Sequence, residues 1–396
     1  MEARKGELQK KLTKPMTGAI LVATAAYAFV NSTTSVLIND IIDTFSLTGA
    51  AQGLLSSMMS MGMMLALIAT PMLQGRVSKT AMMLMSGLLQ AAMLFLSGAA
   101  ASFALFVPAI VALGMGCGWL DTYVNSAMVD VHPTDGPKYL GLLHGLFGVG
   151  SLLAPMAMQW LLLGATWRGV HFIIAGLMLA AMAFMAKLHG DVRKAGGVEA
   201  VEEARLSRKE IGAYVKNGRN LLLLLCGAVT SMVQTGVICW IVRYMLLRYN
   251  LEEMGAVCLT VYWVAATVNR FLAPRLRARP LALVSIGAAL GAVFLSGGIW
   301  SGSAPVMCIA VGLTGLVTGH FMPMMVSVCA EGHQGNTTLT TSVLMFISGA
   351  ARVAVPLLMA AVTDGVSVNG GMMVPAALAL VCALLAMLAL RAGEAQ

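Results

Sequence analysis

Charge is scarce in this sequence. Only 11% of its 396 residues are Asp, Glu, Lys or Arg, whereas 59% are hydrophobic. A soluble domain carries about 25% charged residues, so this chain has too few charges to build an ordinary water-exposed surface. Most of its surface must face the lipid bilayer, where helices satisfy their own backbone hydrogen bonds. The composition therefore predicts a polytopic helical membrane protein.

The motifs of several function classes are absent as well. The sequence contains no Walker motif, so ATP is not expected to drive it directly, and no HExxH motif or nucleophile–base constellation, so we expect no enzyme. Its seven cysteines form no CxxC pair, and no metal-ligand spacing emerges, so we expect neither a metal nor a cofactor. The net charge of +8 is typical of the cytoplasmic loops of membrane proteins, so nucleic acid is not an expected partner.

Long apolar runs make up most of the sequence. A membrane-spanning helix needs about 20 apolar residues, and the charges cut the chain into runs of this order. Two uncharged runs, 80–120 and 280–330, are too long for one helix, so each is expected to hold two helices with a break near 100–103 or 301–303. The remaining runs are 15–39, 44–75, 139–167, 169–186, 220–242, 254–269, 332–363 and 365–390. The sequence therefore predicts twelve spans.

A polar stretch separates the first six spans from the last six. The expected parts are an N-terminal tail, a six-helix bundle, a linker loop, a second six-helix bundle and a C-terminal tail. They cover residues 1–14, 15–187, 188–219, 220–391 and 392–396. Within the linker, 201–215 is predicted to form a helix along the cytoplasmic face. No small-residue cleavage site accompanies the first apolar run, so we expect it to be a retained span.

Basic residues are distributed unevenly over the loops. If the N-terminus is cytoplasmic, the inside segments hold 20 Lys and Arg, and the outside segments hold 3, namely Arg168, Arg243 and Arg248. The other two lie within spans: Arg352, and Arg270, whose place near the inner end of span eight suits a gate or an anchor. This bias follows the positive-inside rule. Both termini are therefore expected on the cytoplasmic side of the inner (plasma) membrane.

The two halves match at a constant offset of 201 residues. The matched pairs are Asp130 with Glu331, His132 with His333, Arg76 with Arg277, Ser126 with Ser327, Gly148 with Gly349 and Pro155 with Pro356. The common offset indicates a parallel duplication, which is frequent in secondary transporters that bind substrate between the halves near the bilayer midplane. We therefore predict an all-α fold of 12 transmembrane helices in two six-helix bundles related by a pseudo-two-fold axis.

This organisation resembles the major facilitator superfamily. Six plus six helices, cytoplasmic termini and a polar middle loop are its architecture. Between spans two and three, Gly75-Arg-Val-Ser-Lys79 keeps a glycine and two basic residues of the superfamily's loop signature and lacks its aspartate. The resemblance therefore implies the superfamily's fold and secondary transport.

A sharper resemblance lies in spans four and five. The stretches Gly114-Met-Gly-Cys-Gly-Trp-Leu-Asp121-Thr-Tyr-Val-Asn125 and Leu140-Gly-Leu-Leu-His144-Gly-Leu-Phe-Gly148-Val-Gly150-Ser-Leu-Leu-Ala-Pro155 are similar to the fucose/galactose/glucose:proton symporter branch. In that branch a glycine-rich stretch precedes an acid and, four positions later, an asparagine. The resemblance implies proton-coupled sugar transport with Asp121 as the acid and Asn125 as the asparagine. The branch also has an acid within span one, near the place where this sequence has Ser35.

Ionisable residues within a bilayer are functional candidates because a charge there is costly. Asp121 is the first candidate for proton coupling, and Asn125 lies one turn away on the same helix face. The alternative for Asp121 is a structural ion pair or a hydrogen bond between helices. His144, near the start of span five, titrates near neutral pH and is a candidate proton relay. Its alternative is an interfacial position without a role in coupling.

Other spans carry candidate substrate contacts. Arg352, near the middle of span eleven, either pairs with an acid such as Asp121 or binds an anionic substrate. Trp240 and Trp263 either stack on a sugar ring or anchor the protein at the membrane interface. The polar candidates for a hydroxyl-bearing ligand, with hydrogen bonds between helices as the alternative, are Asn31, Gln234 and His320.

The expected function is secondary active transport by alternating access. The first candidate cargo is a small polar, sugar-like solute moved with protons, and the second is an organic or sugar-acid anion bound by Arg352. The third, suggested by 31 methionines in an apolar chain, is the export of amphipathic drugs. A receptor would be a different class, and the sequence shows no soluble domain through which to signal. The expected partners are the substrate, protons and lipid, and the chain is expected to act as a monomer.

Overall fold

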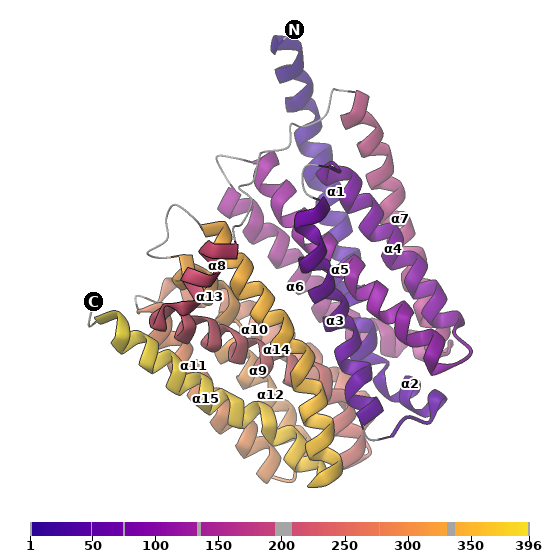
Figure 1. Cartoon of the computed structure of the whole chain (residues 1–396). Helices are drawn as coiled ribbons and strands as arrows, with labels where there is room; N and C mark the ends of the chain where they lie inside the picture. Colours follow the sequence, from indigo (N-terminus) through magenta and orange to yellow (C-terminus); the bar gives the residue numbers. More distant parts are fainter. Residues whose placement is uncertain are drawn as a thin grey trace. The chain divides into compact units, whose positions relative to one another are not determined.

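In the residues that it describes, the computed structural model is built of helices (Figure 1). It describes residues 2–48, 50–73, 76–132, 136–194, 208–276, 278–330 and 337–394. The helices before the predicted linker are α1 (Glu2–Val36), α2 (Ile38–Phe45), α3 (Ala50–Leu73), α4 (Lys79–Ala99), α5 (Phe103–Val131), α6 (Gly136–Leu162) and α7 (Trp167–Lys194). Those that follow are α8 (Arg208–Lys216), α9 (Gly218–Tyr249), α10 (Glu252–Leu272), α11 (Pro280–Trp300), α12 (Ala304–Thr318), α13 (Phe321–Ala330), α14 (Thr337–Gly365) and α15 (Val368–Glu394).

Eleven stretches of the described residues are long and apolar enough to cross a membrane. One of them, Ala304–Cys329, includes both α12 and α13. The eighth helix expected in the membrane is α10, which has a shorter apolar stretch because Glu252, Glu253 and Arg270 lie near its ends. The predicted all-α membrane fold is confirmed, and α10 occupies the place of the predicted span 254–269.

Both predicted breaks are present, and a third was not predicted. Residues 100–102 separate α4 from α5, and 301–303 separate α11 from α12. At the second break Gly302 has a φ of 64°, a left-handed conformation that glycine adopts at little cost. The unexpected break, at Gly319 and His320, divides the tenth span into α12 and α13.

The connection between the first two spans differs from the prediction. α1 ends at Val36, the separate short helix α2 follows, and the second span begins at Ala50 instead of residue 44. Three isoleucines of α2 and the side chain of Asn39 are buried. The helix ends at Ser46, whose N–H bonds to the Asp43 carbonyl in a left-handed conformation. This connection is therefore a packed element.

The helix α8 lies wholly within the predicted linker 188–219, whose first residues, 188–194, form the end of α7. It overlaps the predicted helix 201–215, of which residues 201–207 lie outside the described part of the chain, as do 195–200. Tyr214 on α8 is only 4% exposed and belongs to the same apolar core as Leu223 and Leu224 on α9. The helix therefore packs on the second half of the chain and is more than a solvated charged face.

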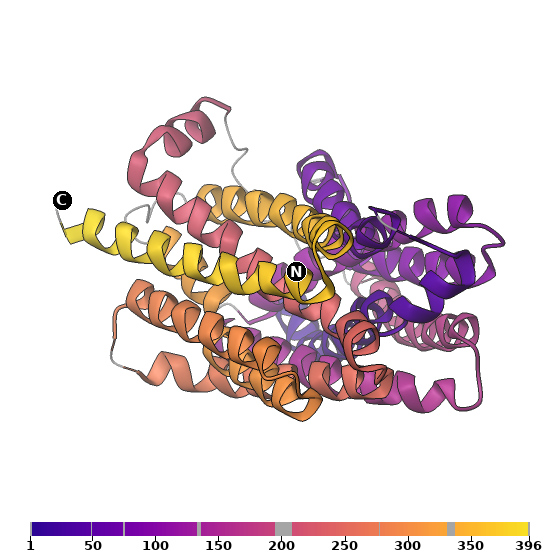
Figure 2. The same ribbon diagram turned by 90° about the horizontal axis from the view of Figure 1, so that it is seen from below.

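The chain divides into two compact units. Unit 1 comprises Met1–Thr33 and Met61–Ala204, and unit 2 comprises Thr34–Ser60 and Arg205–Gln396. In unit 1, α4 packs against α5 and α7. In unit 2, α11 packs against α15 and α12, and α9 against α14 and α15 (Figure 2). The bundle limits 15–187 and 220–391 stay a prediction, because the end of α1, α2 and the start of α3 are grouped here with unit 2.

The internal repeat is visible in the helix starts. Four helices of the second half begin 201 residues after a counterpart in the first half, at Lys79 and Pro280, Phe103 and Ala304, Gly136 and Thr337, and Trp167 and Val368. The packing repeats too, since α4 contacts α5 and α7 as α11 contacts α12 and α15. Of the matched residues, Arg277, Glu331 and His333 lie outside the described part of the chain. The elements thus support the parallel duplication that the sequence offset predicts.

Candidate functional site

In unit 1, the glycine-rich stretch lets α5 approach α3 closely. A Cβ at Gly118 would lie 3.0 Å from Met63 Cα, which is tighter than ordinary contact. Trp119 joins the same two helices, because its indole Nε1 donates to the Ala66 carbonyl at 3.1 Å. These contacts fix the helix turn that carries Asp121 and leave its side chain half-buried.

Asp121 and Asn125 form a local pair on α5. The Asn125 amide Nδ2 donates to the Asp121 backbone carbonyl at 2.7 Å and to Asp121 Oδ1 at 3.3 Å. Both side chains are half-buried. A hydrogen bond to a carboxylate orients it and stabilises its charge. The one-turn spacing read from the sequence therefore brings these two groups together.

Asn31 and His144 lie on other helices of unit 1. Asn31 is half-buried on α1, and its amide makes no hydrogen bond to any residue that the structure describes. The neighbouring hydroxyls of Ser32 and Thr33 instead donate to carbonyls of their own helix, at 3.0 and 2.8 Å. His144 is exposed on α6. Their assigned roles stay predictions.

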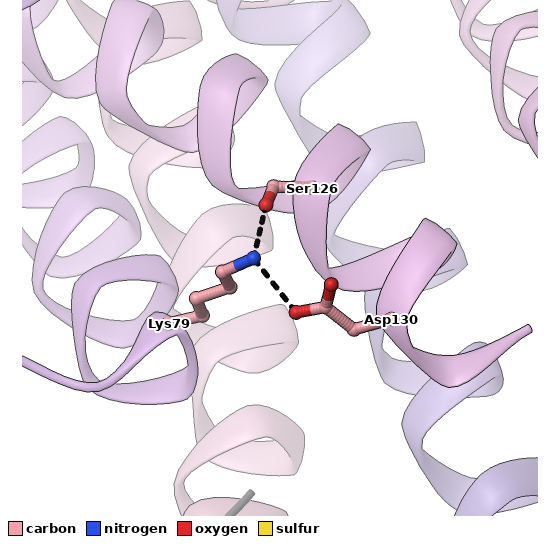
Figure 3. A network of polar contacts seen from close by, with 3 residues as sticks. All are labelled: Lys79, Ser126 and Asp130. Atoms are coloured by element: carbon pink, nitrogen blue, oxygen red, sulfur yellow. Dashed lines mark hydrogen bonds and ion pairs between the residues drawn. The ribbon is translucent and has the colours of Figure 1, made fainter. Parts of the chain in front are cut away.

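An ion pair at the far end of α5 was not predicted. Lys79 Nζ, on the first residue of α4, lies 2.7 Å from Asp130 Oδ2 and also hydrogen-bonds to Ser126 (Figure 3). The two charged side chains are 22% and 21% exposed. From the sequence, Lys79 was identified only as a basic residue of the loop between spans two and three. The four-residue spacing of Ser126 and Asp130 placed both on one helix face, but only packing could supply their partner.

In unit 2, side chains from two helices bond to the unexpected break in the tenth span. Gln234 Nε2 on α9 donates to the Thr318 carbonyl at 2.7 Å, and Arg270 Nε on α10 donates to the Gly319 carbonyl at 3.2 Å. A helix end leaves carbonyls without helical donors, which is costly in lipid. The Gln234 amide nitrogen, predicted to contact substrate, thus bonds to the backbone here.

His320 and Trp263 lie beside the same break. His320 Nδ1 is 2.7 Å from Asn269 Oδ1 on α10, and its side chain is 5% exposed. The Trp263 ring is 7% exposed, and the Arg270 guanidinium lies 5.8 Å from its centroid, a cation–π distance. In this conformation both rings are covered by their neighbours, so neither presents an open face to a solute.

Arg352 on α14 has no carboxylate partner within the described part of unit 2. The side chain is half-buried, and its Nε is buried without a hydrogen-bond acceptor. The guanidinium acts electrostatically on the Cys239 thiol of α9. A cation left uncompensated in a membrane span is suited to binding an anion. The alternative pairing with Asp121 stays a prediction, since the two residues lie in different units.

Trp240, on α9 of unit 2, is enclosed by its surroundings. Its side chain is fully buried, and the indole Nε1 has no hydrogen-bond partner among the described residues. Stacking on a sugar ring requires an accessible face, which Trp240 does not offer in this conformation. Its predicted contact with substrate therefore needs a different arrangement of its surroundings.

A polar cluster around α2 was also missed. Asn39, 1% exposed, donates from Nδ2 to Glu252 Oε1 at 3.0 Å, and its Oδ1 accepts from Arg243 Nη1 at 3.2 Å. All three residues belong to unit 2. Arg243 was interpreted only as an outside-loop charge, because nothing in the sequence indicated that α2 would dock on α9 and α10.

Comparisons with known proteins agree with this architecture. The chain is 20% identical over 328 residues to the inner membrane transport protein YdiN of Escherichia coli K12, a match that covers 81% of this chain and 76% of that protein. Among solved structures, a bacterial homologue of the human lysosomal transporter Spinster, inward-facing and unoccupied, has a TM-score of 0.74 at 14% identity, covering 97% of both chains. The E. coli fucose:proton symporter FucP has a TM-score of 0.63 at 17% identity, covering 94% of this chain and 98% of that one.

The family itself is identified by a broader sequence match. The sequence model of the Major Facilitator Superfamily matches residues 20–296, which is more than half of the chain. The structural neighbours share the fold of twelve membrane helices in two bundles. Because their sequence identity to this chain is low, they support the fold alone. The chain therefore belongs to the major facilitator superfamily and is a multi-pass membrane transporter of small solutes.

Proposed function

We propose that the protein moves a small polar, sugar-like solute across the inner membrane in symport with protons. The observation that carries this proposal is the Asp121–Asn125 pair, a half-buried carboxylate oriented by an amide one turn away. A carboxylate in a membrane span can exchange a proton as its surroundings alternate between dry and wet. Asp121 would bind the proton, and Asn125 would hold the carboxylate when the proton leaves.

The remaining assignments complete this proposal. No described residue forms a hydrogen bond with the Asn31 amide, so this amide is available to bind a hydroxyl group of the solute. His144, exposed on α6, is the proposed proton relay. The inner membrane location draws on the curated relative, whose name places it there. Cytoplasmic termini and a monomer are part of the same proposal.

The coupling role of Asp121 is tested in proteoliposomes. A thermal-shift screen of neutral hexoses, pentoses and sugar acids first selects a solute that binds. For the wild type, an inward proton gradient should drive accumulation of that solute and carry protons, reported by a pH-sensitive dye inside the vesicles. Asp121→Asn should lose both gradient-driven accumulation and proton entry, while exchange of labelled for unlabelled solute continues, because the amide cannot titrate.

Asp191→Asn is the matched control. Asp191 is an exposed acid on α7, so its neutralisation removes the same charge without touching the pair. It should transport as the wild type does. Accumulation by Asp121→Asn at the wild-type level would remove Asp121 from the coupling step and leave a uniporter or a different coupling residue.

A second candidate function is the transport of an organic or sugar-acid anion. Arg352 favours it, because its half-buried guanidinium meets no carboxylate among the described residues of unit 2. A carboxylate of the solute would compensate that charge with a bidentate pair of hydrogen bonds. A solute that carries both hydroxyl groups and a carboxylate would fit both candidate functions.

A further inference from the structure

The segment Thr34–Ser60 is attached to unit 2 by polar contacts with three helices. Besides the two hydrogen bonds of Asn39, Ser57 Oγ donates to the Val353 carbonyl of α14 at 2.7 Å. Ser35 Oγ lies 4.0 Å from Cys239 Sγ on α9, within hydrogen-bonding range for sulfur. α1 and α3 cross from this segment into unit 1, between Thr33 and Thr34 and between Ser60 and Met61. Release of this segment from unit 2 would therefore also free α1 and α3, which both continue into unit 1.

The charges around α2 do not balance. The charge of Arg243 on α9 acts on Asp43 of α2 and Glu252 of α10, whereas Asp40 of α2 is acted on by the negative charges of Glu252 and Asp43. Arg243 is 8% exposed, and its Nε has no hydrogen-bond partner within the described residues. Asp40 and Glu252 are half-buried and carry the same charge, whereas Asp43 is exposed, so the docked segment is a favourable place for a proton.

Asp40 is the carboxyl group that is left without a compensating charge. The charged groups that act on it are Glu252 on the adjoining α10 and Asp43 on its own helix, both negative, while a backbone hydrogen bond acts in the opposite direction. Burial, followed by the charge of Glu252, raises the pKa of Asp40 above its ordinary value of 3.8. The charge of Arg243 interacts with the other two carboxylates, and its Nη1 donates to Asn39 Oδ1 at 3.2 Å.

We propose that α2 is a proton-controlled latch, in which Asp40 binds a proton and the protonated form holds Thr34–Ser60 on unit 2. The site is distinct from Asp121, and in the proposed topology it faces the outside. Proton uptake from outside would favour docking of the segment, so this is a second proton site that controls conformation.

The direction of the pH effect follows from linkage. An undocked α2 in water has a carboxyl with an ordinary pKa, whereas docking raises the pKa of Asp40. The docked state therefore binds the proton more tightly, and acid stabilises docking. This stabilisation is fully present below the ordinary pKa of 3.8, and it is lost as the pH rises through the raised pKa of Asp40 in the docked state. Asp40→Asn mimics the protonated form and should stay docked at all pH values.

The native thiol of Cys239 reports on the latch, because Ser35 of the docked segment lies against it. The purified full-length protein is treated with a maleimide, and the modification rate of Cys239 is followed by peptide mass spectrometry at about pH 5 and about pH 7.5. Each variant is compared with the wild type at the same pH, so that the titration of the thiol itself cancels. No substrate is needed, so the result does not depend on the proposed transport function.

The expected results separate the two parts of the proposal. Asn39→Ala removes both bridging hydrogen bonds and should raise the Cys239 rate by roughly threefold to tenfold. Asp40→Asn should lower the rate at the higher pH, and its difference from the wild type should be smaller at the lower pH. Asp364→Asn, an exposed acid at the end of α14, is the control and should change neither.

Two results would overturn the proposal. Asn39→Ala with an unchanged Cys239 rate would show that the segment does not depend on this cluster. Asp40→Asn with the wild-type rate at both pH values would show that the proton binds elsewhere. A thermal unfolding curve for each variant identifies a misfolded protein, and Asn39→Asp provides an isosteric second variant that loses the amide donor to Glu252.

Discussion

The intramembrane charges of this protein are compensated in different ways. Asp121 is bonded by an amide of its own helix, one turn away. Arg270 donates to the Gly319 carbonyl and lies over an aromatic ring, so helix packing occupies it. This suits the anchor predicted for that residue. Arg352 differs, because nothing described in unit 2 balances it, and this makes it the residue at which substrate charge can be tested.

Arg352→Gln is expected to weaken the binding of sugar acids roughly tenfold or more, because a neutral amide replaces a bidentate cation. Binding of neutral sugars should change much less. Arg352→Lys should recover part of the affinity, since it restores the charge without the fork of donors. Titrations followed by thermal shift or calorimetry measure these affinities.

Arg391→Gln is the appropriate control for that experiment. Arg391 is an exposed cation at the end of α15, so its loss changes the net charge equally without altering the spans. If Arg352→Gln binds acids as tightly as the wild type, the anion candidate loses its main support, and Arg352 would instead be a structural charge.

At the scale of elements, the tenth span shows how a helix can be interrupted inside the membrane. α12 ends where Gly319 meets α10, and a Cβ at that glycine would collide with the Ala266 carbonyl and lie 2.7 Å from Ala266 Cα. Donors from α9 and α10 satisfy the carbonyls that the break exposes. The interruption is therefore held by packing and hydrogen bonds together, and both depend on neighbours far away in sequence.

Gly319→Ala is expected to lower stability by about 1–3 kcal/mol, because the added methyl group pushes α12 away from α10. The measurement is the apparent melting temperature in detergent. Gly297→Ala on α11 is the matched control, since a Cβ there meets nothing within 4 Å. It should be neutral or slightly stabilising, as alanine favours a helix over glycine. Equal effects of the two changes would contradict the close packing at Gly319.

At the scale of the whole molecule, the duplication accounts for the number and order of the helices. Helix starts repeat at the same offset as the matched residues, and the packing within each unit repeats with them. The two halves have nevertheless diverged in detail. α5 is continuous from Phe103 to Val131, whereas its counterpart is broken into α12 and α13. The polar residues that bond to this break, Gln234 and Arg270, belong to the second half.

The membrane topology follows from the same regularity and can be tested directly. A fluorescent protein fused after Gln396 should fluoresce, and alkaline phosphatase inserted at Gly302 should be active, because the positive-inside rule places the former inside and the latter outside. Gly302 suits an insertion because it lies in a connection between spans, with nothing within 4 Å of an added Cβ. Phosphatase activity at the C-terminus and none at Gly302 would reverse the assigned orientation.

The sequence by itself determined the membrane class, the spans and the duplication. These depend on local properties: the scarcity of charge, the length of apolar runs and a constant offset between matched residues. The Asp121–Asn125 pair was predictable for the same reason, since helix geometry alone brings together residues one turn apart. The break at Gly319 was missed because an uncharged run carries no mark of where its helix is interrupted, and α2 was missed because Asp40 and Asp43 mark the end of a span without indicating a helix that packs there.

Only the tertiary structure decided which polar groups meet across helices. Lys79 reaches Asp130, Gln234 reaches Thr318, and Asn39 joins Arg243 to Glu252, in each case across tens to hundreds of residues. In a membrane span a polar side chain takes whichever partner the neighbouring helices provide, because water offers none. Residue type and spacing therefore predicted that these groups need partners, while helix packing selected the partner.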